Sequence, residues 1–259
     1  MKKSILLSFD IEEFDIPEEY GQKIDENKQF YVSLQGLKSV ISLIDLLEIR
    51  ATFFVTANFA IHHQEMIRII SQNHEIASHG FYHSSFSLED LEKSRTTLEQ
   101  ITNSRVTGFR MPRLMDVDDT ALHTAGYQYN SSMNPTYIPG RYNNFFKQRT
   151  VYYSNDICNI PVSVTPRIRF PLFWLSFKNF PLLWMKIASQ RTLQYDSYLC
   201  LYFHPWEFTD IQDFYLPSFI KRHSGRVMVE RLRKYLGWLK NQGEFMTFSE
   251  FIHSKNFYQ

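Results

Sequence analysis

"SILLSFD", residues 4–10, is a short apolar run that predicts a buried β-strand. Further along, "LQGLKSVISLIDLLE" (34–48) has apolar residues at helical spacing, and "ATFFVTA" (51–57) again has the pattern of a strand. A strand, a helix and a second strand in this order are typical of the βαβ unit, whose strands are parallel. These segments therefore predict an α/β protein built on a parallel sheet.

The same alternation continues along most of the chain. Helical patterns are found at residues 63–73, 87–101, 116–126 and 225–243, and strand patterns at 74–79, 105–110, 127–132 and 197–204. The part around 132–190 is irregular and rich in Pro, Asn and aromatic residues, so we expect inserted loops, a short hairpin and one helix there. We expect a single domain over residues 1–259, because a chain of this length can bury one large core.

Composition excludes several classes of protein. The formal net charge is +1, so we expect no nucleic-acid partner. Cys158 and Cys200 are far apart, which argues against a disulfide scaffold and against a thiolate zinc site. The start, Met1-Lys2-Lys3, is basic, but the apolar run that follows ends at Asp10 and is too short for a secretory signal. We therefore expect a cytoplasmic location.

Polar residues gather where four of the expected strands end. They lie in "SFDIEEF" (8–14), "SHGFYH" (78–83), "FRMPR" (109–113) and "LYFHPWEF" (201–208). The carboxyl ends of parallel strands meet at one rim of a sheet or barrel, where active sites of such folds lie. The four segments are therefore predicted to form one site.

Two histidines in the second segment are candidate metal ligands. His79 and His83 are four residues apart, so their imidazoles can face one point from a compact loop. With one carboxylate they make a three-ligand site that leaves room for water. The alternative is a pair of surface histidines beside a turn. His74 lies at the other end of the expected strand and is not expected to be a ligand.

The carboxylate is expected to come from the first segment. Side chains alternate along an extended chain, so Asp10 and Glu12 share one face while Glu13 lies on the other. One member of a carboxylate pair can bind metal while the other acts as a general base. The alternative is a solvated acidic junction between strand and loop.

In their order and approximate spacing, the four segments resemble the motifs of the polysaccharide deacetylases (NodB homology, carbohydrate esterase family 4). The resemblance extends from about residue 4 to about residue 250. The first motif is most similar to the subgroup with Phe-Asp-x-Glu-Asp in place of Phe-Asp-Asp-Gly-Pro. The resemblance implies a distorted (β/α) barrel of about seven strands, one divalent metal ion, usually Zn²⁺, and hydrolysis of an N-acyl group of an amino sugar.

The resemblance also implies roles for single residues. Asp10 matches the catalytic base, and His79 and His83 match the two histidine ligands. Arg110 and Pro112 match an Arg-x-Pro motif whose arginine orients the base.

Two further roles come from the same resemblance. Leu114 occupies a usually aromatic position whose backbone N–H stabilises the oxyanion, and His204 matches the late histidine that acts as general acid. Trp206 and Glu207 are expected to be wall and loop-anchoring residues.

The chain departs from the family pattern at two places. Ile11 stands where most members have an aspartate ligand, so Glu12 is assigned that role by the alternation of side chains, with Glu13 in reserve. The aspartate that usually steadies the late histidine, in an Asp-x-x-Trp motif, has no match between residues 145 and 185.

The predicted function is metal-dependent removal of an N-acyl group, acetyl being favoured, from an amino sugar of a polysaccharide or lipid-linked saccharide. Because of the two departures, the alternative is a carbohydrate-binding or scaffolding barrel with degenerate catalysis. A relative that hydrolyses a non-sugar amide, as allantoinase-like members do, is a third reading.

Residues 167–191, "RIRFPLFWLSFKNFPLLWMKIASQR", are aromatic and aliphatic with basic flanks. Interruptions such as Lys178 and Pro181 prevent the segment from spanning a bilayer. It can lie in the membrane interface, which predicts peripheral association and a lipid-linked substrate. The alternative is a core helix and hairpin covering the barrel.

Overall fold

Strand β1 (Ser4–Ile11) is an interior strand of the main sheet, and all of its residues are buried. On one side it pairs in parallel with β10 (Tyr198–Phe203). On the other side it pairs first with β11 (Glu244–Phe245) and then with β2 (Thr52–Val55). The computed structural model describes residues 3–255, so residues 1–2 and 256–259 of the expected domain lie outside the described residues.

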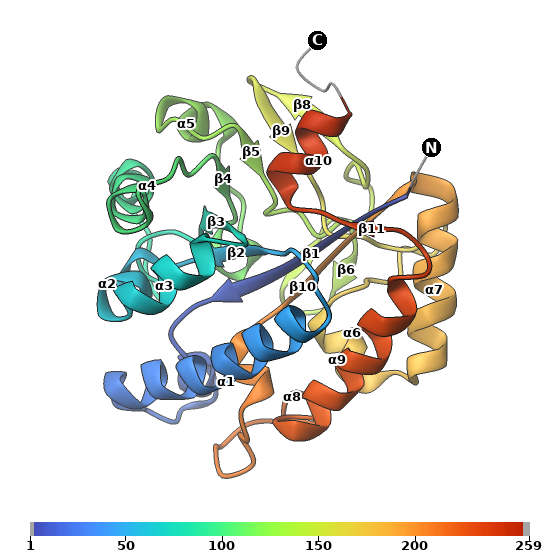
Figure 1. Ribbon diagram of the computed structural model, residues 1–259, viewed down its shortest axis with the longest axis horizontal. Helices are drawn as coiled ribbons and strands as arrows, with labels where there is room; N and C mark the ends of the chain where they lie inside the picture. The colour runs from blue at the N-terminus through green and yellow to red at the C-terminus, as the bar shows by residue number, and fades with distance from the viewer. Residues whose placement is uncertain (1–2, 256–259) are drawn as a thin grey trace.

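Across the described residues the main sheet has nine strands, in the order β10-β1-β2-β3-β4-β5-β9-β8 with β11 beside β1. The remaining strands of this sheet are β3 (Glu75–Ser78), β4 (Gly108–Phe109), β5 (Tyr129–Asn130), β8 (Tyr152–Ser154) and β9 (Ile157–Asn159). All pairs are parallel except β8 with β9. The sheet curls into a distorted barrel (Figure 1), which confirms the predicted fold class.

The open side of the barrel is bridged by the chain that follows β9. The backbone N–H of Ser163 donates to the carbonyl of Cys200 in β10 (3.0 Å), and the N–H of Cys200 donates to the hydroxyl of Ser163 (2.8 Å). Cys158 and Cys200 are both buried and are not joined by a disulfide.

Helices surround the sheet on its outer side (Figure 1). They are α1 (Glu26–Leu46), α2 (Ala57–His62), α3 (Gln64–Ser71), α4 (Glu89–Thr102), α5 (Asp119–Thr124), α6 (Trp174–Asn179), α7 (Leu182–Asp196), α8 (Ser218–Lys221), α9 (Arg226–Leu239) and, packed at one end of the barrel, α10 (Phe248–Ser254). Short 3₁₀ turns are η1 (Ile16–Tyr20), η2 (Pro112–Leu114) and η3 (Pro205–Phe208), and β6 (Tyr137–Ile138) pairs with β7 (Tyr142–Asn143) as a separate hairpin.

The main differences from expectation lie in two places. Helix α1 begins before residue 34, because the carboxylate of Asp25 accepts from the backbone of Asn27 and Lys28 and caps it. Over 132–190 the expected short hairpin is present as β6 and β7, but the expectation of one helix was wrong, since this part holds α6, α7 and also strand β9 of the main sheet. A strand as short as β9 is too brief to show a period in the sequence.

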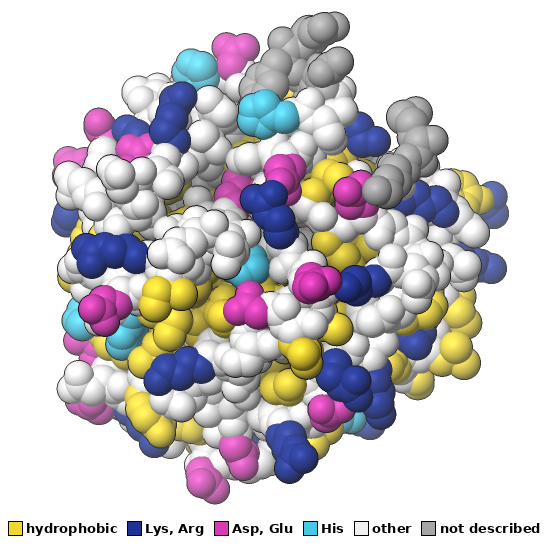
Figure 2. Space-filling model, in the orientation of Figure 1, with side chains coloured by type: hydrophobic (Ala, Val, Ile, Leu, Met, Phe, Trp, Pro, Cys, Tyr) yellow, Lys and Arg dark blue, Asp and Glu magenta, His cyan; other side chains and the backbone are white. Residues whose placement is uncertain are grey.

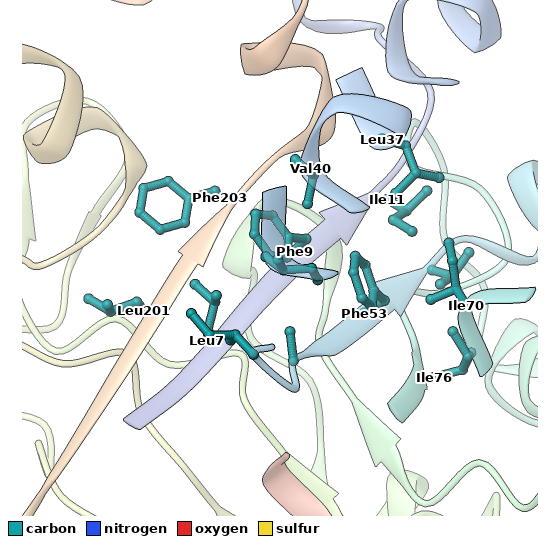
Figure 3. Close-up of a cluster of buried hydrophobic side chains, with 14 of the residues drawn as sticks. Leu7, Phe9, Ile11, Leu37, Val40, Phe53, Ile70, Ile76, Leu201 and Phe203 are labelled. Atoms are coloured by element: carbon teal, nitrogen blue, oxygen red, sulfur yellow. The ribbon is translucent and has the colours of Figure 1, made fainter. Parts of the chain in front are cut away.

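Because side chains alternate along β1, one face of the strand packs against the outer helices and the other faces the barrel interior. Leu7, Phe9 and Ile11 point toward the helices, and in Figure 3 Phe9 lies between Val40 of α1 and Phe53 of β2. The rings of Phe9 and Phe53 stack with centroids 5.4 Å apart.

The opposite face of β1 contributes to the barrel interior. Leu6 packs there with Phe54, Tyr129 and Phe248, the last from α10. Asp10 follows Leu6 on this face at the carboxyl end of the strand, so the strand directs its carboxylate into the barrel mouth.

Candidate active site

Six of the predicted site residues line one cavity of about 340 Å³ at the carboxyl ends of the strands. They are Asp10, Glu12, His79, His83, Leu114 and His204. The parallel register brings them together, because Phe9 lies opposite Phe203 and Ser78 lies opposite Phe109, so β1, β10, β3 and β4 end at the same level. The four sequence segments therefore meet at one cavity, as predicted.

Glu12, His79 and His83 form a buried cluster that could hold a metal ion. The Oε2 atom of Glu12 lies 3.2 Å from Nε2 of His79 and 3.1 Å from Nε2 of His83. The three ligand atoms lie within 4.8 Å of one another. Two imidazole nitrogens and one carboxylate oxygen facing one point are a donor set that zinc and similar divalent ions accept.

The rings of both histidines are fixed from behind. Nδ1 of His79 lies 2.8 Å from the backbone carbonyl of Arg110, and Nδ1 of His83 lies 2.7 Å from Oδ1 of Asp15. Asp15 in turn accepts from Arg113 (3.1 Å). Such outer partners set the tautomer that leaves Nε2 free to bind metal, so the surroundings also fit a metal site.

The charges of the cluster also fit a metal site. Burial disfavours an ionised Glu12, but the surrounding imidazoles, that of His83 foremost, hold the pKa of Glu12 well below its usual range. Burial likewise opposes a charged His83, yet Glu12 and then Asp15 raise the pKa of His83 to about 9. The carboxylates therefore attract positive charge to this point, which a bound cation would also satisfy.

Glu13 lies outside the cluster. Its two carboxylate oxygens accept from the hydroxyl of Thr56 (3.1 Å) and from the amide of Asn58 (2.7 Å). Burial raises the pKa of Glu13. Of the two candidates for the acidic ligand, the structure brings Glu12 to the histidines and directs Glu13 to the start of α2.

Asp10 is held by a buried arginine. Nη1 of Arg110 donates to Oδ1 of Asp10 (2.6 Å) and to the hydroxyl of Ser8 (2.9 Å). The rest of the guanidinium donates to the carbonyl and hydroxyl of Ser131 (3.1 and 2.9 Å) and lies 4.0 Å from the ring centroid of Phe54. Because both side chains of this ion pair are buried, Arg110 fixes Asp10 in place and compensates its charge.

Leu114 lines the cavity, but its backbone N–H is engaged. This N–H donates to the carbonyl of Met111 (3.0 Å), and the φ angles of Arg113 and Leu114 are positive (57° and 52°). The oxyanion role of Leu114 stays a prediction.

His204 follows β10 and faces the cluster from the opposite side. Its Nε2 lies 4.0 Å from Oε1 of Glu12, and its ring stacks on Trp206 with centroids 5.0 Å apart. Burial opposes the charged ring, but Glu12 and then Glu207 raise the pKa of His204.

Sequence reasoning missed Asp15, which supports His83. It expected Trp206 and Glu207 as wall and loop-anchoring residues, but not their contacts: Trp206 lines the cavity and donates its indole N–H to Oε1 of Glu12 (3.0 Å), and Glu207 contacts His204. Glu207 is three residues from His204 in "HPWEF", a spacing that closes one turn and could have suggested the contact.

Comparison with known proteins adds the family. The model of the family described as polysaccharide deacetylase matches residues 2–130. The chain belongs to this family. No curated protein sequence matches the chain.

Solved structures share the fold at low identity. A proposed polysaccharide deacetylase from Mycobacterium smegmatis superposes with a TM-score of 0.68 at 17% identity, covering 98% of this chain and 90% of that one. A family 4 acetyl xylan esterase from Clostridium thermocellum, solved with a cobalt ion, gives 0.52 at 16%, covering 98% and 92%. A carbohydrate esterase family 4 pseudoenzyme from Bacillus anthracis gives 0.52 at 14%, covering 96% and 65%. These structures share the fold over 96–98% of the chain, and thus also over residues after 130, which the family model does not match.

Proposed function

We propose that this protein is a metal-dependent hydrolase that removes an N-acyl group, acetyl in the first instance, from an amino sugar of a polysaccharide or lipid-linked saccharide. The observation that carries the proposal is the meeting of Glu12, His79 and His83 with Asp10 and His204 in one cavity. Family membership supports the reaction class.

A divalent ion would be held by Glu12, His79 and His83, and zinc suits this donor set. Such an ion supplies Lewis-acid polarisation of the acyl carbonyl and makes water more acidic.

The residues of the chain supply the proton transfers. Asp10, fixed by Arg110, would accept a proton from the attacking water, and His204 would give one to the departing amine. The predicted oxyanion contact of Leu114 requires its N–H to leave the Met111 carbonyl, so η2 would have to change on substrate binding.

The alternative, a carbohydrate-binding barrel without efficient catalysis, rested on two departures from the family pattern. Glu12 lies beside the two histidines despite Ile11, and Glu207 contacts His204 despite the absent aspartate. Both observations favour the enzyme over the binding protein.

We further propose that residues 167–191 hold the protein at an anionic membrane surface. Part of the segment is core, since Phe177 and Met185 are buried. The outer side is also apolar, with Leu183 69% exposed and Trp184 43% exposed. Figure 2 shows hydrophobic side chains on the right, over α7, with Lys and Arg beside them. Within residues 3–255, no helix combines the length and apolar character needed to cross a bilayer.

A substrate screen tests the proposed reaction. The purified protein, stripped of metal and reloaded with Zn²⁺ or Co²⁺, is incubated with acetylated and formylated amino sugars, free, oligomeric and lipid-linked, and the released acid is measured. Acid release that depends on metal and on Asp10 is expected. Saccharide binding without acid release from any substrate would favour the binding protein.

A further inference from the structure

His204 is held by a carboxylate from its own turn. Oε1 of Glu207 accepts the backbone N–H of His204 (2.7 Å) and lies 3.2 Å from Nδ1 of its ring. With Nδ1 occupied, the Nε2 edge of the ring faces the cavity and Glu12. The contact therefore sets both the ring orientation and the nitrogen that meets the substrate.

Glu207 has a buried cation behind it. Nζ of Lys178 lies 3.6 Å from Oε2 of Glu207, and both side chains are 0% exposed. Neither atom has a hydrogen-bond partner among the described residues. Burial lowers the pKa of Lys178, and Glu207 opposes that shift. An isolated buried carboxylate is strongly destabilising, so Lys178 offsets the charge that Glu207 brings to the histidine.

Helix α6 places this cation beside the histidine. Lys178 and Trp174 are four residues apart on α6 and thus share a face. The ring of Trp174 meets that of His204 edge-on at 5.2 Å, and the ammonium lies 6.0 and 5.6 Å from the ring centroids of Trp174 and Trp206. Nothing in the reaction described above uses Lys178.

We propose that Glu207 and Lys178 are positioning residues that act through His204: Glu207 fixes the ring with Nδ1–H toward itself and Nε2 toward the leaving group, and Lys178 supports Glu207 from behind as its buried ion-pair partner. The inference deepens the proposed function and rests on it. It assigns a steadying carboxylate in a chain that has no Asp-x-x-Trp aspartate between 145 and 185.

The step affected is cleavage of the C–N bond. As this bond breaks, the proton on Nε2 of His204 moves to the leaving nitrogen, while Asp10 has taken the proton of the attacking water. An amine leaves only when it is protonated, whereas 4-nitrophenolate leaves without a proton. Loss of positioning should therefore slow amide hydrolysis far more than hydrolysis of 4-nitrophenyl acetate.

The test compares these two substrates in Glu207→Gln. We expect kcat for an acetylated amino-sugar oligomer to fall roughly 10²-fold with KM changed less than about threefold, and turnover of 4-nitrophenyl acetate to change less than about threefold. The exposed Glu230→Gln is the matched control and should be unchanged. Equal loss on both substrates would overturn the proposal.

Two further variants separate positioning from folding. Glu207→Gln with Lys178→Met removes both buried charges together, so it should retain the fold and still show the selective loss. On a His204→Gln background, Glu207→Gln should cause no further loss of amide hydrolysis, because Glu207 acts only through His204. An additional tenfold loss there would contradict the inference.

A readout independent of activity uses nitrogen-15 NMR of the histidine rings, with the His204 signals identified by His204→Gln. We expect neutral His204 to carry its proton on Nδ1 in the unaltered protein and to become a tautomer mixture in Glu207→Gln. An unchanged tautomer would overturn the positioning role. If the unaltered protein hydrolyses no amide, the proposed function fails, whereas this spectrum still decides how His204 is held.

Discussion

Three neighbouring carboxylates occupy three different environments. Asp10 pairs with Arg110, Glu12 meets two imidazoles, and Glu13 turns to hydroxyl and amide donors at the start of α2. Because Asp10 and Glu12 share a face and Glu13 does not, one strand end can present a base and a ligand side by side. Single substitutions should therefore separate their roles.

Replacing Asp10 by Asn should remove turnover but not metal. The base is lost while Glu12, His79 and His83 remain, so we expect kcat to fall by roughly 10² to 10⁴ with metal content unchanged. Acid release and metal analysis measure the two effects. Glu13→Gln, on the opposite face, is the control and should keep most activity. Loss of metal in Asp10→Asn would assign Asp10 to the ligands instead.

The two histidines should be necessary for metal. His79→Ala with His83→Ala leaves one carboxylate, which is too few ligands for tight binding, so stoichiometric metal should disappear after dialysis. His62→Ala with His253→Ala removes two exposed histidines elsewhere and should leave the metal content unchanged. Equal metal content in the two double variants would reject the site.

Some site residues could be predicted from the sequence, because the direction of their side chains follows from alternation or spacing within one short segment. Glu12 was assigned by alternation, and His79 and His83 by their spacing. Asp15 and Lys178 could not be found in this way, because their contacts depend on how η1 and α6 fold back over the barrel mouth. Such contacts belong to tertiary packing, which local patterns do not contain.

At the scale of elements, α1 and η3 lie against each other without room between them. A Cβ on Gly36 of α1 would lie 1.8 Å from the carbonyl oxygen of Pro205, the first residue of η3. The turn of η3 begins directly after His204 and includes Trp206 and Glu207. The position of α1 therefore helps to set the position of the late histidine.

Replacing Gly36 by Ala should displace η3. We expect a loss of stability of about 1–3 kcal/mol from overpacking, and a larger fall in amide hydrolysis than in metal binding, because His204 moves while the ligands do not. Denaturant unfolding, metal titration and acid release measure the three effects.

Gly237→Ala in α9 is the matched control. A Cβ there meets nothing within 4 Å, so the same change in a helix should be neutral or stabilising by up to about 1 kcal/mol. If both glycine variants have the same activity, α1 does not set the position of η3.

Most elements were predictable in type, whereas their bounds and some short elements were not. The helical pattern at 63–73 includes α3, and the strand patterns at 105–110 and 127–132 include β4 and β5, but the start of α1, helix α2 and strand β9 escaped detection. In a strand as short as β9, pairing within the barrel outweighs any local preference.

For the whole molecule, residues 167–191 connect the site with the surface. Trp174 lines the cavity beside His204, while Leu183 and Trp184 are exposed on α7. The segment has five Lys or Arg residues and no Asp or Glu. The core interpretation thus describes the buried residues of 167–191, and the membrane-interface interpretation describes its exposed residues. The exposed apolar and basic side chains are of the kinds that bind an anionic lipid surface.

The protein should therefore sediment with anionic vesicles at low salt and be released at high salt, because basic residues near the lipid contribute about 1 kcal/mol each and are screened by ions. Leu183→Ser with Trp184→Ser should abolish binding, since their side chains would no longer enter the interface.

Phe146→Ser, at an aromatic residue 91% exposed outside the segment, is the matched control and should bind normally. Trp174→Ala should bind normally but lose activity, because its ring contacts His204. Absence of vesicle binding at low salt, or binding indifferent to the Leu183 and Trp184 changes, would contradict the membrane proposal and make a soluble saccharide the better substrate hypothesis.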